Sequence, residues 1–159
     1  MQDLLLRTGR SVRDVYTEHA GSVYRVAYTY LKNRYDAEDA VQETFLRLIR
    51  AQPQLRDEQH ERAWLLRTAV NLCRDQLRAK ARRQEDLDEH AELAAPEQTP
   101  NALLEAVLAL PEKYRAVLFL HCVEGYAVRE IAAMLRCPPA TIKTRLSRAR
   151  ELLRKEWEV

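Results

Sequence analysis

Apolar side chains recur at steps of three and four residues along most of the chain, the spacing of a buried stripe on an α-helix. The first stripe runs from Val12 to Tyr30 and predicts a helix of about five turns. Residues 33–35 break it, and Asp36 then has the position and chemistry of an N-cap for a second helix. The apolar stripe of this second helix has six members: Ala37, Ala40, Val41, Phe45, Leu48 and Ile49.

A polar stretch that contains Pro53, residues 51–60, separates the second helix from a third one, from about Glu61 to Arg83. The third helix has an apolar face from Leu65 to Leu77 and becomes basic toward its end. Three helices of this length can bury one small core. The first half of the chain is therefore predicted to be a three-helix domain.

The second half repeats the helical spacing in shorter pieces. Asn101 is a plausible N-cap for residues 102–109, and Pro111 suits the first turn of a helix that continues to His121. A short helix, residues 128–135, and a last one, residues 140–157, follow. The chain has three glycines and none of the Asn-Gly, Asp-Gly or Gly-Gly pairs that favour tight hairpins, so we predict an all-α protein.

The last two helices have the pattern of a helix-turn-helix, in which a short helix is crossed by a longer one after a tight turn. Ala132 supplies the small residue that the crossing needs. At about 100° per residue, Leu146, Ala149 and Leu153 fall on the side of Ile142, so hydroxyl and cationic side chains face outward. Phosphates, base acceptors and thymine methyls are what such side chains meet in a major groove. Residues 143–155 carry six cations and one acid, so we expect DNA affinity to fall steeply with salt.

Charge divides the chain into three blocks, although its net value is only +2. Residues 1–83 have a net charge of +5, residues 84–101 of −6 and residues 102–159 of +3. We therefore predict two small helical domains, 1–83 and 102–159, joined by an acidic flexible linker, 84–101. Two basic blocks around an acidic spacer suggest modules that meet polyanions.

Composition argues against several other classes of protein. No apolar run approaches the ~20 residues that span a bilayer, and the start is too short for a secretory signal, so we expect a cytoplasmic protein without membrane insertion. Three dispersed cysteines predict reduced thiols. An enzyme that uses the four histidines and the cysteines around a metal is disfavoured, because CxxC, HxxxH and HExxH spacings do not occur in the sequence. We expect no cofactor and no catalytic residues.

The order of these segments resembles the extracytoplasmic-function class of bacterial sigma factors, from about Val12 to Trp157. The segment 36–50 reads DAEDAVQETFLRLIR and looks like the polymerase-binding helix of that family. Residues 61–83, ERAWLLRTAVNLCRDQLRAKARR, look like its promoter-melting helix, and residues 110–153 are similar to its domain for the minus-thirty-five element. Arg136, Ala127 and Ala140 depart from the family, which usually has Gly, Ser and Gly there, so Arg136 must form the turn without the freedom of glycine at positive φ.

The resemblance implies three sets of binding residues, two domains with the fold of sigma regions two and four, and a mechanism. The core-polymerase-binding set is Asp39, Gln42, Glu43, Leu46 and Arg47. The set for the single-stranded minus-ten element is Gln59, His60, Arg62, Trp64, Asn71, Arg74 and Arg78. The set for the duplex minus-thirty-five element is Thr141, Lys143, Thr144, Arg145, Ser147 and Arg148.

The implied function is to bind core RNA polymerase and to direct promoter recognition and melting. The implied partners are core RNA polymerase, promoter DNA and an anti-sigma factor. The alternative is a plain helix-turn-helix regulator that binds DNA without acting as a polymerase subunit. Its first module would then serve for dimerisation or sensing, and capture by polymerase would separate the two hypotheses.

Overall fold

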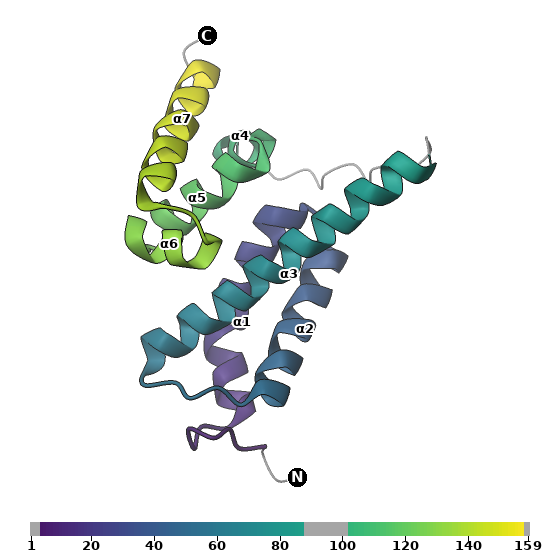
Figure 1. The fold of residues 1–159 in the computed structure, drawn as a ribbon, viewed down its shortest axis with the longest axis vertical. Helices are drawn as coiled ribbons and strands as arrows, with labels where there is room; N and C mark the ends of the chain where they lie inside the picture. Colours follow the sequence, from purple (N-terminus) through teal and green to yellow (C-terminus); the bar gives the residue numbers. More distant parts are fainter. Residues whose placement is uncertain (1–3, 88–101, 158–159) are drawn as a thin grey trace. The chain divides into compact units, whose positions relative to one another are not determined.

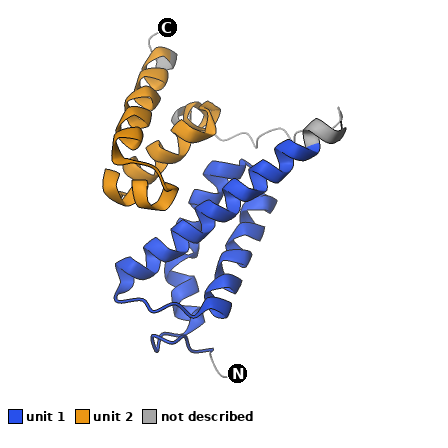
Figure 2. Cartoon of the chain, in the orientation of Figure 1, with its two compact units in different colours: residues 1–89 blue, residues 90–159 orange. Residues whose placement is uncertain are grey.

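The computed structural model describes residues 4–87 and 102–157, with side chains for 4–83, 102 and 104–155. It divides into two compact units, Met1–Glu89 and His90–Val159 (Figures 1 and 2). In the part of the chain that the structure describes, every regular element is a helix apart from one isolated bridge between Leu5 and Ser11. The predicted fold class, all-α with two helical domains, is confirmed. None of the described helices is both long and apolar enough to span a bilayer.

The first unit is a bundle of α1 (Val12–Leu31), α2 (Arg34–Ala51) and α3 (Glu58–Leu87). Each helix packs on the other two, and α3 lies across the pair formed by α1 and α2 (Figure 1). The core consists of side chains with at most 1% exposure, drawn from all three helices: Val15, Val23, Val26, Ala27, Ala37, Leu48, Leu65, Leu66, Ala69, Val70 and Cys73. The apolar stripes that the sequence predicts therefore meet in one core.

The start of α2 differs from the prediction that Asp36 is its N-cap. Asn33 caps the helix instead, because its Oδ1 accepts hydrogen bonds from the backbone N–H of Tyr35 at 2.8 Å and of Asp36 at 3.1 Å. Asn and Asp are about equally good caps, and both can pair with an N–H two or three residues on, so the sequence did not decide between the two positions. Asp36 lies in the first turn of α2, where its negative charge interacts favourably with the positive end of the helix dipole.

Helix α3 begins three residues before the predicted Glu61 and continues to Leu87. Asp57 caps it: the backbone N–H of His60 donates to Asp57 Oδ1 at 2.8 Å. The helix therefore enters the acidic block that begins at residue 84. Most of the predicted linker, residues 88–101, and the predicted N-cap Asn101 lie outside the described residues.

The second unit contains α4 (Ala102–Ala109), α5 (Glu112–Cys122), α6 (Val128–Leu135) and α7 (Pro139–Trp157). Helix α7 packs on α4, α5 and α6, and its apolar side is buried through Ile142, Leu146 and Ala149. Ala132 is 5% exposed on α6, as the predicted crossing of two helices requires. The pair α6 and α7 thus forms the predicted helix-turn-helix.

The turn between α6 and α7 depends on Arg136, whose backbone is left-handed at φ 56° and ψ 48°. In that conformation the N–H groups of Arg136 and Cys137 both donate to the carbonyl oxygen of Ala132. This arrangement ends α6 and lets α7 begin at Pro139, one residue before the predicted start. Arginine therefore occupies a backbone conformation that glycine adopts at no steric cost.

Candidate functional site

One side of α2 carries the residues predicted to bind polymerase. At about 100° per residue the five fall within about 140° of arc, so they share a face. Asp39, Gln42, Leu46 and Arg47 are exposed, and the apolar side chain of Leu46 is 44% exposed. Glu43 is half-buried, and its Oε1 lies 3.5 Å from Arg47 Nε and 3.5 Å from Arg50 Nη1. The face has an apolar centre with charged groups around it.

The structure places four of the seven predicted minus-ten residues in two separate hollows. Trp64 and Asn71 line one hollow of about 410 Å³, which Thr68 of α3 and Arg47, Arg50 and Ala51 of α2 complete. Gln59 and Arg62 line another hollow of about 300 Å³, which faces α1 and includes Glu18 and His19. Arg47 and Arg50 line the first hollow, whereas Glu18 and Glu58 line the second one beside Arg62. The first hollow is therefore the better site for a polyanion.

A basic ridge continues from the first hollow along α3. Arg67, Asn71, Arg74 and Arg78 fall within about 60° of one another around the helix. Arg67 and Arg78 are exposed, and Arg74 is half-buried. Asp75 lies beside the ridge, 3.7 Å from Arg78 Nη1, and more exposed cations follow: Lys80, Arg82 and Arg83. A charged strip of this kind can follow a phosphate backbone.

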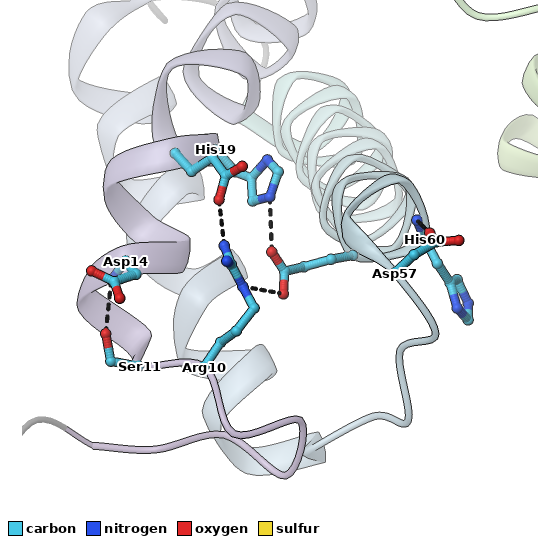
Figure 3. A network of polar contacts seen from close by, with 8 residues as sticks. Arg10, Ser11, Asp14, His19, Asp57 and His60 are labelled. Atoms are coloured by element: carbon cyan, nitrogen blue, oxygen red, sulfur yellow. Dashed lines mark hydrogen bonds and ion pairs between the residues drawn. The ribbon is translucent and has the colours of Figure 1, made fainter.

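His60 is tied into the start of α3. Its Nδ1 accepts from the backbone N–H of Arg56 at 3.2 Å, while its own backbone N–H caps onto Asp57. Figure 3 shows its ring on the outer side of the α2–α3 connection, pointing away from His19 and Arg10. Because Nδ1 accepts, the neutral ring carries its proton on Nε2 and presents a donor to the outside.

A buried ionic network lies on the inner side of the same helix start. Glu61 is 2% exposed; its Oε1 lies 2.9 Å from Nε2 of His19, which is 3% exposed, and its Oε2 accepts from Arg10 Nε at 3.2 Å (Figure 3). Arg10 also pairs with Glu18, and the hydrogen bond to Glu18 and the charge of Glu61 raise the pKa of Arg10. Among the described residues, Glu18, His19 and Glu61 have ligand atoms within 4.8 Å of one another. The guanidinium of Arg10 pairs with both carboxylates, so we interpret this group as a structural network.

Helix α7 presents the predicted minus-thirty-five set outward. Lys143, Thr144, Ser147 and Arg148 are exposed, whereas Thr141 and Arg145 are half-buried. Two hollows run along this surface, of about 510 and 570 Å³, and both are lined by Thr144 and Arg148. Four residues outside the predicted set also line these hollows: Lys113, Tyr114, Ala140 and Glu151. Lys113 and Tyr114 come from α5, and only the packing of α5 on α7 brings them here.

The comparisons with known proteins identify the family. The model of sigma-70 region 2 matches residues 15–83, and that of sigma-70, region 4 matches residues 101–153. The chain is 36% identical over 154 residues to the ECF RNA polymerase sigma factor SigE of Mycolicibacterium smegmatis, covering 89% of this chain and 59% of that relative. It is 30% identical over 162 residues to the ECF sigma factor SigW of Bacillus subtilis, covering 90% and 87%. The chain belongs to the extracytoplasmic-function sigma factors.

A solved structure supports the fold of this sigma factor. The sigma factor RpoE in complex with the anti-sigma factor NepR from Bartonella quintana superimposes with a TM-score of 0.76 at 24% identity. The match covers 92% of this chain and 96% of that one. The resemblance drawn from the sequence is confirmed, and the alternative of a plain helix-turn-helix regulator is wrong, because region 2 accompanies the DNA-reading domain.

Proposed function

We propose that this sigma factor binds core RNA polymerase through α2, reads and melts the minus-ten element with α3, and reads the minus-thirty-five element with α7. One observation carries the proposal: the hollow of about 410 Å³ that holds Trp64 and Asn71 opens between the exposed face of α2 and the basic ridge of α3. Its volume is within the range of pockets that hold small organic ligands. A single unstacked base is a ligand of that class.

In this proposal the hollow recognises a base of the non-template strand that has left the duplex. The indole of Trp64 offers a stacking surface, and the amide of Asn71 can donate to and accept from the edge of a base. The ridge of Arg67, Arg74 and Arg78 neutralises phosphates on either side. Holding an extruded base lowers the free energy of the open strand relative to the duplex, so recognition and melting are one event.

The region 4 unit supplies duplex recognition. Lys143 and Arg148 can donate to guanine or to phosphates, and the hydroxyls of Thr144 and Ser147 can meet either bases or backbone. Thr141 and Arg145, which are half-buried, suit phosphate contacts that fix the register of α7 in the groove. We assign residues 1–83 and 102–159 to the two domains and the acidic residues 84–101 to the linker between them.

Polymerase docking uses the face around Leu46, since interfaces combine an apolar centre with a polar rim. RNA synthesis then belongs to the polymerase, and this sigma factor contributes no catalytic residue of its own. We infer that it acts in the cytoplasm, where polymerase and promoter DNA meet. The complex of RpoE with NepR supports an anti-sigma factor as a further partner.

Run-off transcription with core RNA polymerase and a promoter library tests the proposal. We expect the purified chain to direct synthesis from a defined set of start sites that share two sequence elements. The proposal would be contradicted if core polymerase together with this chain initiated at no start site that core polymerase alone does not use.

Two sets of variants test the surfaces separately. Leu46→Ala combined with Glu43→Ala should reduce capture of core polymerase without loss of helical content. Lys143→Ala and Arg148→Ala should weaken binding to duplex promoter DNA, each by about tenfold, as expected for a lost charged contact. Lys155→Ala, which removes the same charge from an exposed position further along α7, is the matched control and should have a smaller effect. Equal effects at positions 143 and 155 would contradict the assigned reading face.

A further inference from the structure

Residues 4–11, the amino-terminal arm, fold back on the start of α1. The backbone N–H of Gly9 donates to Leu6 O at 2.8 Å, that of Leu6 to Arg10 O at 2.8 Å and that of Val12 to Leu4 O at 2.9 Å. Leu6 is 6% exposed and anchors the arm in the bundle. The arm is therefore an ordered part of the region 2 unit.

The arm is hydrogen-bonded to the first residue of the α2–α3 loop, residues 52–57, and to the first turn of the helix that follows the loop. At its first residue, Gln52 Oε1 accepts from the backbone N–H of Arg7 at 2.7 Å. After the loop, in the first turn of α3, Glu61 Oε2 accepts a hydrogen bond from Arg10. The other carboxylate oxygen of Glu61 is hydrogen-bonded to His19. The arm therefore links the end of α2 to the start of α3, and these two contacts restrict how far the two helix ends can move relative to each other.

The loop itself is closed at each end by a helix cap. Gln52 ends α2 in a left-handed conformation at φ 44°, and its Nε2 donates to Ile49 O at 3.1 Å. Asp57 begins α3 with the capping contact to His60. Ala51, the residue before the loop, and Trp64, two turns into α3, line the hollow proposed for the base. A shift of the loop therefore moves one wall of that hollow relative to the other.

We propose that the amino-terminal arm positions the α2–α3 loop, and thereby sets how strictly the minus-ten base is discriminated, with Arg7 N–H, Gln52 and Arg10 as the positioning groups. The inference rests on the proposed function. Discrimination between bases requires groups held to within about 0.5 Å, whereas phosphate attraction tolerates looser placement. Release of the arm should thus reduce base preference more than it reduces overall DNA binding.

The arm offers a substitution that removes one hydrogen bond and little else. Residues 6–9 form a β-turn with Arg7 at its second position, where proline is favoured. Arg7→Pro deletes the N–H that Gln52 accepts and preserves the turn, whereas Arg7→Ala removes the same guanidinium and keeps the N–H. A second pair acts from the other side: Gln52→Glu keeps the acceptor oxygen and Gln52→Leu removes it, while both lose the donor to Ile49 O, so the comparison between them isolates the bond to the arm.

The test is run-off transcription by holoenzyme on promoters with a randomised minus-ten element, scored as the enrichment ratio of preferred over disfavoured bases. We expect Arg7→Pro and Gln52→Leu to reduce this ratio about fivefold relative to Arg7→Ala and Gln52→Glu, the net effect of one hydrogen bond. Preference for the minus-thirty-five element, read by the other unit, should be unchanged in all four.

Equal minus-ten ratios within both pairs would overturn the inference, as would a loss shared equally by the minus-thirty-five element. If Arg7→Pro does not fold, the Gln52 pair decides alone. Wild-type protein that selects no minus-ten sequence would instead refute the proposed function itself, and the inference with it.

Discussion

Replacing Arg136 by glycine tests whether the turn of the helix-turn-helix stores strain. Arg136 adopts φ 56° and ψ 48°, in the left-handed region, and the turn depends on it because the hydrogen bond from the Cys137 N–H back to Ala132 O requires that conformation. A side chain with a Cβ costs about 1–2 kcal/mol there. Glycine removes this cost but loses about 0.5–1 kcal/mol through the greater freedom of the unfolded chain. We therefore expect Arg136→Gly to stabilise the region 4 unit by about 0.5–1 kcal/mol.

Thermal unfolding of the full chain measures this change, with amide hydrogen exchange of α6 and α7 to report on the second unit alone. A unit of this size shifts its midpoint by about 4–8 °C per kcal/mol, so we expect an increase of about 2–8 °C. Arg136→Ala is the matched control, because it removes the same guanidinium and retains the Cβ. Since both variants lose one positive charge, their DNA affinities should be equal, and only their stabilities should differ.

The reasoning would be refuted by an alanine variant as stable as the glycine variant. That result would mean that a Cβ in the left-handed conformation costs nothing at this position. A glycine variant that is less stable than wild type would mean that the arginine side chain stabilises the turn by more than the strain costs. Unequal DNA affinities of the two variants would show that the turn also adjusts how α7 enters the groove.

Two other predictions concern stability. Ala127 is the N-cap of α6 in an extended conformation, and its backbone N–H already donates to Glu130 Oε1 at 3.0 Å. Ala127→Ser should therefore complete the capping box and raise the free energy of unfolding, measured in denaturant, by about 1 kcal/mol. Ala133→Ser, on an exposed position inside α6, should not stabilise, and an equal gain there would contradict the capping argument. Burial raises the pKa of the Cys73 thiol from 9.0 to about 12. As the pH rises above 9, the unfolded chain therefore loses this proton while the folded chain keeps it. The free energy of unfolding should then fall with pH, by up to about 1.4 kcal/mol per pH unit. Cys73→Ala should flatten the fall between pH 9 and 11, and parallel curves would contradict it.

Helical spacing was enough to predict most of the fold, because a helix buries residues that are near one another in sequence. Most of the stripe of the first helix and the crossing side chains Ile142, Leu146 and Ala149 are buried where the periodicity placed them. Tyr16, on the same predicted stripe, is instead 46% exposed. The end of α3 and the cap of α2 were less certain for a local reason: helix ends depend on competition between neighbouring polar residues of similar capping strength.

The binding surfaces could be predicted only as faces of single helices. Trp64 and Asn71 share a hollow with Arg47 because α2 packs on α3, and Lys113 lines a hollow of α7 because α5 packs on it. The network around Glu61 joins residues 42 and 51 positions apart, and its members look like ordinary polar residues in the sequence. From the sequence alone, a histidine in an apolar stripe that pairs with a buried carboxylate looks the same as one that is buried without such a partner.

The buried network also explains how α3 can combine an open hollow with a fixed start. A hollow lined by Trp64 and Asn71 leaves apolar and amide surface without protein neighbours, so it contributes little to holding the helix in place. Glu61 lies in the first turn of the same helix, and its buried carboxylate has two partners, the ring Nε2 of His19 and the guanidinium of Arg10. A displacement of α3 that separated Glu61 from either partner would leave a buried carboxylate oxygen without its hydrogen bond. Such a pair contributes little net stability, but it penalises every arrangement that separates its members. The penalty restricts the rotation and translation of α3 relative to α1, and so the ionic network can fix the geometry of the hollow that we propose for the minus-ten base.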